Sequence, residues 1–149
     1  MKKNKKKDYI KIGILGGTFD PPHKGHLYIS KVALKKLRLK KILWVITKKN
    51  PLKNKPYLKL NERIKLSKAI TKKNRKISIK YFDEKIGSTN TFNLLKYLKR
   101  KTKAYLFFII GADNMKKFHK WKNWKKNTKT CKNCCFSKKE SFIWFFCQQ

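Results

Sequence analysis

Apolar positions along the chain change their spacing several times, and each change predicts a different element. Ile10, Ile12 and Ile14 alternate with lysine and glycine, and a period of two predicts a β-strand over residues 9–15 that ends in the Gly16-Gly17 turn. Leucine, valine and alanine then recur at helical spacing among lysines, which predicts an amphipathic helix over residues 25–39. The opening unit is therefore strand, glycine turn and helix.

Further strands and helices alternate along the rest of the chain. Apolar runs predict strands over residues 42–47, 76–82 and 104–110, and helical spacing predicts helices over residues 58–71 and 91–101. Alternation of this kind predicts an α/β fold, a Rossmann-like open parallel sheet with helices on both faces. Ligands in such folds bind beyond the carboxyl ends of the strands. That rule selects four loops as walls of one site: residues 16–26, 48–55, 83–91 and 111–124.

Length and composition favour one folded domain. The chain has 149 residues, of which 40% are hydrophobic and 13% aromatic, so it can bury enough apolar surface to offset the entropy of ordering. We expect a basic, disordered leader over residues 1–8 and one domain over residues 9–126. The cysteine- and aromatic-rich tail over residues 127–149 is atypical, and its residues 131–137 are a candidate for the last strand of the same domain.

The charge balance is strongly positive and raises a rival hypothesis. Lysine and arginine number 42 against 7 acidic residues, a formal charge of +35, which suits a polyanionic partner such as nucleic acid. Nearly all of these residues are lysines scattered through every segment, whereas nucleic-acid readers favour arginine for bidentate contacts. A basic nucleic-acid-binding protein without catalysis is therefore kept as the alternative, and no dedicated nucleic-acid partner is expected.

Neither a membrane protein nor a metalloprotein is indicated. The longest apolar runs, residues 105–110 and 142–146, are far shorter than a bilayer span, and the basic leader lacks the apolar core of a signal peptide. We therefore expect a cytoplasmic protein. Cys131, Cys134, Cys135 and Cys147 include one Cys-x-x-Cys pair, but a specific zinc site has a second pair of ligands. We expect reduced thiols and no metal bound by protein ligands.

The most specific segment is GGTFDPPHKGH at residues 16–26, directly after the first predicted strand. Its two glycines let the backbone approach a phosphate closely, Thr18 offers a hydroxyl, and the next helix adds free N–H groups and the positive end of a dipole. His23 and His26 are three residues apart, so they share one face of a helix that begins there. Neither the phosphate-loop pattern nor the three-glycine dinucleotide fingerprint is present. The segment predicts an anion site that contains two imidazoles.

This segment resembles the T/HxGH nucleotidyltransferase signature, in the GGTFDPPHxGH form of bacterial nicotinate-nucleotide adenylyltransferases. Further blocks follow in the family's order. TKKNPLK at residues 47–53 resembles the loop after the family's second strand, and FIIGADN at 108–114 with FHKW at 118–121 is similar to the family's IIGADN and FHKW blocks. GSTNT at 87–91 stands where the family has Tyr-Thr-x-Asp-Thr. Thr91 matches that pattern, and Asn90 replaces the usual aspartate.

The resemblance implies adenylyl transfer from ATP to nicotinate mononucleotide, which gives deamido-NAD and pyrophosphate in NAD biosynthesis. It makes Mg²⁺ the cofactor, held mainly by the ATP phosphates. The implied catalytic residues are His23, His26 and Thr18. Those implied to bind ATP are Gly16, Gly17, Thr18, Phe19, His26, Gly111 and Asp113, and those implied to bind the mononucleotide are Lys53, Thr91 and Trp121. In this scheme Asp113 accepts hydrogen bonds from ribose hydroxyls, and Trp121 offers a flat face to the pyridine ring.

The resemblance holds to about Trp124 and is lost beyond Asn127. Members of the family usually continue with a strand and a Ser-Ser/Thr-x-x-Arg motif that opens a helix and helps to bind the ATP phosphates, and this sequence contains no such motif. A second alternative is therefore an inactive, C-terminally truncated adenylyltransferase remnant. The apolar residues 142–146 either pack on the sheet or make a subunit contact, so a homo-oligomer stays open.

Overall fold

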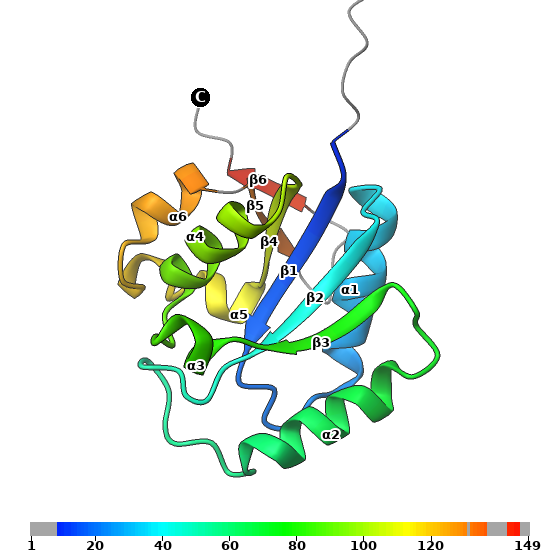
Figure 1. Cartoon of the computed structure of the whole chain (residues 1–149), viewed down its shortest axis with the longest axis vertical. Coiled ribbons are helices and arrows are strands. Elements are labelled where there is room, and N and C mark those ends of the chain that lie inside the picture. The colour runs from blue at the N-terminus through cyan, green and yellow to red at the C-terminus, as the bar shows by residue number, and fades with distance from the viewer. Residues whose placement is uncertain (1–8, 131, 137–142, 147–149) are drawn as a thin grey trace, which may run out of the picture.

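The computed structural model describes residues 9–130, 132–136 and 143–146, which build an α/β fold around one sheet (Figure 1). The predicted fold class is confirmed. Within these residues the sheet has six strands, which lie side by side in the order β3 (Ile77–Tyr81), β2 (Lys41–Ile46), β1 (Lys11–Gly17), β4 (Tyr105–Gly111), β5 (Lys132–Phe136) and β6 (Ile143–Phe146). The chain steps outward from β1 to β3 and then returns to the other side of β1, so the strand order reverses between β1 and β4.

The three long helices that the sequence predicts are present, and short ones join them. The long helices are α1 (Lys24–Lys36), α2 (Leu60–Thr71) and α4 (Thr91–Lys101). The short ones, which the sequence analysis did not predict, are α3 (Asp83–Ile86), α5 (Ala112–Met115), the 3₁₀ turn η1 (Phe118–Lys120) and α6 (Trp124–Thr130). In the described part of the chain, none of these helices is long and apolar enough to cross a membrane.

The two glycines after the first strand differ from the prediction. They were expected to form the turn, but Gly16 pairs with Val45 and Gly17 with Ile46, so both belong to β1. The chain turns two residues after Gly17, where Phe19 adopts a left-handed backbone with φ 50°. Few residues with a side chain adopt that conformation. Gly16 and Gly17 are therefore the last two residues of β1, and they place no side chain between their backbone and the space at the end of the strand.

The last strand departs from the all-parallel pattern. Strands β1 to β5 pair in parallel, whereas β6 pairs with β5 antiparallel, with Asn133 opposite Phe146 and Phe136 opposite Ile143. A parallel neighbour needs a crossover of about a dozen residues or more, and the segment between β5 and β6 is shorter than that. The strand expected over residues 131–137 is therefore β5, and the apolar end of the chain supplies an antiparallel edge.

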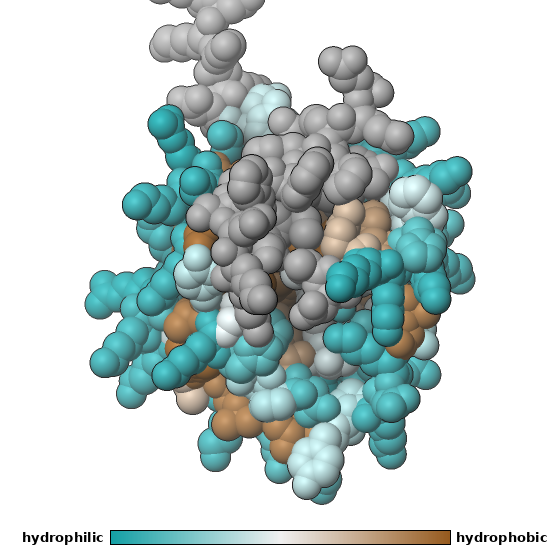
Figure 2. All heavy atoms as spheres, turned by 180° about the vertical axis from the view of Figure 1, so that it is seen from behind, coloured by the Kyte–Doolittle hydropathy of each residue, from teal (hydrophilic) through white to brown (hydrophobic). Residues whose placement is uncertain are grey.

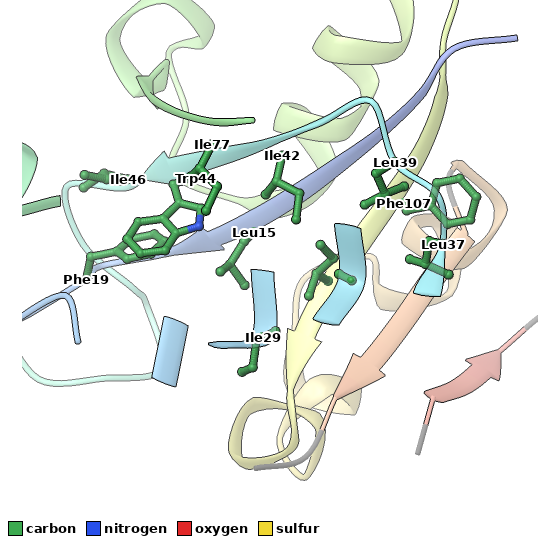
Figure 3. Packing of buried hydrophobic residues seen from close by; sticks show 12 residues of the cluster. Leu15, Phe19, Ile29, Leu37, Leu39, Ile42, Trp44, Ile46, Ile77 and Phe107 are labelled. Carbon is green, nitrogen blue, oxygen red and sulfur yellow. The ribbon is translucent and has the colours of Figure 1, made fainter. Parts of the chain in front are cut away.

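Side chains of the central strands alternate between two buried clusters, one on each face of the sheet. The cluster shown in Figure 3 packs under α1 and α2 and contains Leu15, Phe19, Ile29, Ala33, Leu37, Leu39, Ile42, Trp44, Ile46, Ile77, Phe107 and Ile109. The cluster under α4 and η1 contains Ile12, Ile14, Leu43, Val45, Leu95, Leu98, Leu106, Phe108, Ile110 and Phe118. The sheet is thus covered on both faces, and only the ends of its strands can form a site.

Candidate functional site

A cavity of about 330 Å³ lies at the carboxyl ends of the parallel strands. All four loops that the strand-end rule selects contribute to it, together with the ends of the strands before them. The lining residues are Gly16 and Gly17 at the end of β1 and Thr18 after it; Val45 near the end of β2 and Thr47, Asn50, Pro51, Leu52 and Lys53 after it; Asp83, Thr89, Asn90, Thr91 and Leu94 after β3; and Asn114, Lys120, Trp121 and Lys122 after β4. The structure thus brings the four selected loops together around one cavity, which sits where the strand order reverses.

The two histidines of the motif form the first turn of α1. His23 is the N-cap, and its Nδ1 accepts a hydrogen bond from the backbone N–H of Gly25 at 3.0 Å. His26 returns the contact, because its Nδ1 accepts from the backbone N–H of His23 at 3.2 Å. The ring centroids lie 3.9 Å apart. The pair therefore works as a capping box built from imidazoles instead of the usual hydroxyl and carboxylate.

This capping arrangement decides which ring nitrogen carries a proton. A nitrogen that accepts a hydrogen bond has its lone pair occupied and no proton of its own. Since Nδ1 is the acceptor in both His23 and His26, the neutral form of each ring carries its proton on Nε2. Both rings are thereby set up as Nε2–H donors at the positive end of the α1 dipole, which is the arrangement that an anion requires.

The ring of His26 packs against buried aromatic side chains, Phe19 and behind it Trp44. The His26 ring lies 4.7 Å from that of Phe19, and Phe19 stacks on Trp44 at 4.9 Å between ring centroids. Figure 3 shows Phe19 and Trp44 side by side at the end of the buried cluster. Phe19 is only 2% exposed, so its side chain belongs to the core. Any contact of Phe19 with a nucleotide must therefore come from its backbone.

Sequence reasoning missed the residue that ties the site together, Arg63 on α2. This side chain is 2% exposed, and its guanidinium donates to four backbone carbonyls. These acceptors are the oxygens of Thr18 at 2.6 Å, Thr47 at 2.8 Å, Lys48 at 3.1 Å and Leu58 at 3.1 Å. One buried cation therefore joins the loops that follow β1 and β2 to the start of α2.

The available signal for Arg63 was its residue type. In a chain whose basic residues are nearly all lysine, an arginine at a helix position beside Leu60 and Ile64 implies a need for a flat, many-donor group. Its acceptors are backbone oxygens far away in sequence, and backbone oxygens leave no mark in a sequence. The hydrogen-bond partners of Arg63 could therefore not be predicted from the sequence, although the arginine itself stood out among the lysines.

The carboxylates of Asp20 and Asp83 also hold the loops after β1 and β2 through hydrogen bonds. Asp20 accepts from the backbone N–H groups of Tyr57 and Leu58. Asp83 accepts from the hydroxyl of Thr47 at 2.8 Å and from the backbone N–H of Lys48 at 2.6 Å. Burial lowers the pKa of the Arg63 guanidinium from its ordinary value, and the negative charges of Asp20 and Asp83 oppose that change. Arg63 therefore keeps its charge at neutral pH, with its buried cation compensated.

The predicted mononucleotide residues all line the cavity. Trp121 is partly buried, and its ring lies 5.4 Å from that of Phe118 and 5.9 Å from that of Phe108, edge to face in the second case. Thr91 begins α4, whose N-cap Asn90 accepts from the N–H of Asn93 at 2.9 Å. Asparagine and aspartate cap helices equally well, which explains why Asn90 can stand at this position. Lys53 is exposed on the loop after β2.

Gly111 and Asp113, which were predicted to bind ATP, lie at the end of β4 and directly after it. Gly111 is the last residue of β4 and the N-cap of α5. Asp113 lies on α5, and its side chain is outside the described part of the structure, as are the side chains of Cys134 and Cys135. Cys131 and Cys147 are outside the described residues altogether. Lys120 and Lys122, which the sequence analysis did not select individually, line the cavity together with Lys53.

The cavity is suited electrostatically to an anion. Of the described residues that line it, three are lysines and one, Asp83, is acidic. Outside the cavity, hydrophilic side chains are spread around the described part of the face in Figure 2 and do not gather in one patch. Within the described residues, no group of three or more His, Cys, Asp or Glu side chains could hold a metal ion. The three lysines, the backbone of Gly16 and Gly17 and the N-terminus of α4 therefore make the cavity suited to a negatively charged ligand.

Comparison with known proteins defines first the class and then the family. The cytidylyltransferase-like family model matches residues 14–148, so it extends through the tail where the motif resemblance was expected to stop. Relatives named probable nicotinate-nucleotide adenylyltransferase include one from Pelagibacter ubique, which is 51% identical over 91% of this chain and 74% of its own length. Another, from Rhizobium meliloti, is 37% identical over 77% of this chain and 62% of its own length. The chain belongs to the nicotinate-nucleotide adenylyltransferase family.

Solved structures agree with this assignment. A protein from Vibrio parahaemolyticus assigned to the nicotinate-nucleotide adenylyltransferases matches with a TM-score of 0.69 and 25% identity, over 85% of this chain and 76% of that one. The Plasmodium falciparum nicotinic acid mononucleotide adenylyltransferase, solved in complex with NaAD, has the same fold, with a TM-score of 0.69 and 18% identity over 89% of this chain. The matched part of this chain spans about three quarters of the length of these two proteins.

Proposed function

We propose that this protein transfers the adenylyl group of ATP to nicotinate mononucleotide, releasing pyrophosphate and forming deamido-NAD. The observation that carries the proposal is the imidazole capping box at the start of α1, in the same segment as Gly16, Gly17 and Thr18, which line the cavity, although His23 and His26 are not among the described lining residues. The family membership and the names of the relatives support the choice of substrates. The three lysines that line the cavity suit phosphate-bearing ligands.

The reaction needs no covalent intermediate on the protein. A phosphate oxygen of the mononucleotide attacks the α-phosphorus of ATP, and the bond from that phosphorus to the oxygen bridging toward the β-phosphorus breaks. Pyrophosphate leaves with the bonding electrons, and the adenylyl group joins the mononucleotide. Such a displacement is accelerated by holding both phosphates in line and by stabilising the negative charge that spreads over the transferred group.

The residues after β1 are suited to the ATP half of this task. Gly16 and Gly17 present backbone without side chains, so a phosphate can approach closely. Thr18 adds a hydroxyl at the cavity wall. Because Nδ1 accepts a hydrogen bond in both His23 and His26, a neutral ring would carry its proton on Nε2 and could donate it to a phosphate oxygen, while α1 adds its dipole. On the other side of β1, Gly111 and Asp113 are proposed to serve the adenosine part.

The residues after β2 and β3 are suited to the mononucleotide. Lys53 would neutralise phosphate charge at the open side of the cavity. Thr91 stands at the N-terminus of α4, where free N–H groups favour an anionic substituent such as the nicotinate carboxylate. Trp121 would offer its ring face to the pyridine, because its other contacts with Phe108 and Phe118 fix its plane.

Mg²⁺ is proposed as the companion of ATP, bound to its phosphates and to water. Of the described residues that line the cavity, Asp83 is the one carboxylate, and its Oδ2 already accepts two hydrogen bonds. Mg²⁺ typically keeps several waters and binds through few protein groups plus substrate phosphates, so this donor set fits a metal carried in by the nucleotide. The ion would neutralise charge on the phosphates.

The test is pyrophosphate release by purified protein with ATP, Mg²⁺ and nicotinate mononucleotide, beside nicotinamide mononucleotide. We expect turnover on the nicotinate form, a loss of at least about 100-fold in His26→Ala because a charge-stabilising donor is removed, and full activity in Lys31→Ala, an exposed change on the same helix. Well-folded protein without turnover would sink the proposal. Steeply salt-dependent binding to DNA or RNA would then favour the basic-binder alternative.

A further inference from the structure

Helix α2 contributes no residue to the described lining of the cavity, yet one of its side chains holds two of the cavity walls. The carbonyl of Thr18 ends the glycine segment after β1, and the carbonyls of Thr47 and Lys48 begin the loop after β2. Arg63 Nη1 donates to both Thr18 and Thr47, at 2.6 and 2.8 Å. A single nitrogen therefore bridges the wall suited to ATP and the wall suited to the mononucleotide.

The rest of the guanidinium extends this bridge. Nη2 donates to Lys48 at 3.1 Å, and Nε donates to Leu58 at 3.1 Å. Because the guanidinium is planar and rigid, its donors keep fixed directions, and the carbonyls that accept from them are held at fixed separations. A lysine at the same place has one nitrogen on a flexible stem and cannot reach four acceptors spread over three segments.

We propose that Arg63 is a positioning residue for the adenylyl transfer: its guanidinium sets the distance between the loop after β1 and the loop after β2, and so aligns the two substrates for in-line attack. This inference rests on the proposed function. Arg63 itself is 2% exposed and touches neither substrate. It acts through the backbone of Thr18, Thr47 and Lys48.

The carboxylates of Asp20 and Asp83 add further hydrogen bonds to the segments that Arg63 joins. Asp20 holds the N–H groups of Tyr57 and Leu58, which lead into α2, and Asp83 holds Thr47 and Lys48 from the β3 side. The loop after β1 is therefore fixed by the carbonyl of Thr18, which accepts from Arg63, and by the carboxylate of Asp20, which accepts from the segment before α2. The loop after β2 is fixed by its carbonyls, which accept from Arg63, and by the N–H of Lys48, which donates to Asp83. Such fixation predicts that the cavity walls are ordered before any substrate binds.

The first experiment measures amide hydrogen exchange of the wild-type protein without substrate. We expect slow exchange at Lys48, Tyr57 and Leu58, although these residues are exposed or lie at loop ends, because their N–H groups are held by Asp83 and Asp20. Exchange as fast as in an unstructured peptide would overturn the proposal. This measurement needs no variant that folds and no catalysis.

The second experiment compares Arg63→Lys with Arg100→Lys, the same chemical change at an exposed helical position on α4. Well below the melting temperature, we expect Arg63→Lys to lower kcat by roughly 10- to 100-fold, as small misplacements of reacting groups do. The KM values should change less, since the groups that contact the substrates remain. In the same variant, exchange at Thr47, Lys48 and Leu58 should rise, while that at Leu98 of α4 and at Thr102, the C-cap of α4, stays unchanged.

The outcomes separate positioning from stability alone. If Arg63→Lys only lowers the melting temperature, with wild-type kcat in the folded protein, Arg63 is a stability residue and the proposal is wrong. Equal acceleration of exchange in the loops and in α4 would also overturn it, because that pattern reports global loosening. If the wild-type protein itself does not turn over, the proposed function fails, and the local exchange changes still decide whether Arg63 fixes the two loops.

Discussion

The indole N–H of Trp44 donates to the hydroxyl of Ser30 at 2.7 Å, deep between β2 and α1. Ser30 in turn donates to the carbonyl of His26 at 2.8 Å. Both Trp44 and Ser30 are fully buried. A short chain of hydrogen bonds therefore connects β2 with the first turn of α1, which carries the motif histidines.

Ser30→Ala tests this connection. The change leaves a buried indole N–H without its acceptor, and an unsatisfied buried donor costs about 1–3 kcal/mol. We expect a matching loss in the free energy of unfolding, measured by chemical denaturation, and a moderate fall in kcat. Ser78→Ala, a partly buried serine on β3, is the control and should change little.

Trp44→Phe completes a double-mutant cycle with Ser30→Ala. Phenylalanine removes the N–H together with some volume, so Trp44→Phe is destabilising by itself. In that background Ser30→Ala no longer strands a donor, and its cost should shrink by about 1 kcal/mol or more. Strictly additive effects of the two changes would show that the hydrogen bond contributes nothing to the coupling.

Alanine should have different effects at two glycines of β1, lowering stability at Gly13 and turnover at Gly16. A Cβ on Gly13 would lie 2.7 Å from Leu39 Cδ1 and 2.9 Å from Ile42 Cγ1, closer than packed atoms allow, whereas a Cβ on Gly16 would meet nothing nearer than Phe108 at 3.6 Å. Gly13→Ala should therefore destabilise the fold by about 1–3 kcal/mol through overpacking.

Gly16→Ala should leave the melting temperature close to that of the wild type and reduce turnover, since Gly16 lines the cavity. The comparison of melting temperature with kcat/KM separates a glycine needed for packing from one needed for substrate approach. A Gly16→Ala protein with wild-type turnover would mean that no phosphate passes close to this residue.

His23 has two separable roles, as an N-cap and as a phosphate donor. Asparagine caps a helix well but has no Nε2–H group, so His23→Asn should keep the stability of α1 while turnover falls. His23→Ala loses both roles, with a further destabilisation of about 1 kcal/mol. Thermal unfolding and pyrophosphate release measured on both variants make the distinction. Equal turnover in His23→Asn and the wild type would leave His23 with the capping role alone.

The sequence predicted the long elements and the loops of the site well, because both depend on local patterns. Hydrophobic period identifies β1, β2, α2 and α4 within about two residues, and the strand-end rule then needs only their order. The end of α1 was placed too late. Leu37 and Leu39 continue the apolar pattern, but Arg38 adopts a left-handed φ of 51° and the helix ends at Lys36.

What the sequence did not predict depends on contacts between distant residues. The resemblance implied that Phe19 contacts ATP, yet its ring stacks on Trp44 inside the core. Arg63 holds the loops after β1 and β2 by donating to backbone carbonyls, and any residue can supply a carbonyl. The role of Asp83 likewise depends on the path of the loop after β2. These features follow only from the folded arrangement of β1, β2 and α2.

Asp83 is the acidic residue among the described cavity walls, and we expect its role as a hydrogen-bond acceptor to matter more for turnover than its negative charge, since Asp20 also supplies a negative charge near Arg63. Its Oδ2 accepts from both Thr47 and Lys48. An amide oxygen also has two lone pairs, so Asp83→Asn can keep both contacts, whereas Asp83→Ala loses them. We expect Asp83→Asn to stay within about 3-fold of wild-type kcat/KM and Asp83→Ala to lose roughly 10-fold or more as the loop after β2 moves. Steady-state kinetics with both substrates decide the matter. If Asp83→Asn were as damaged as Asp83→Ala, the carboxylate charge would matter in itself, either to Arg63 or to a group bound in the cavity.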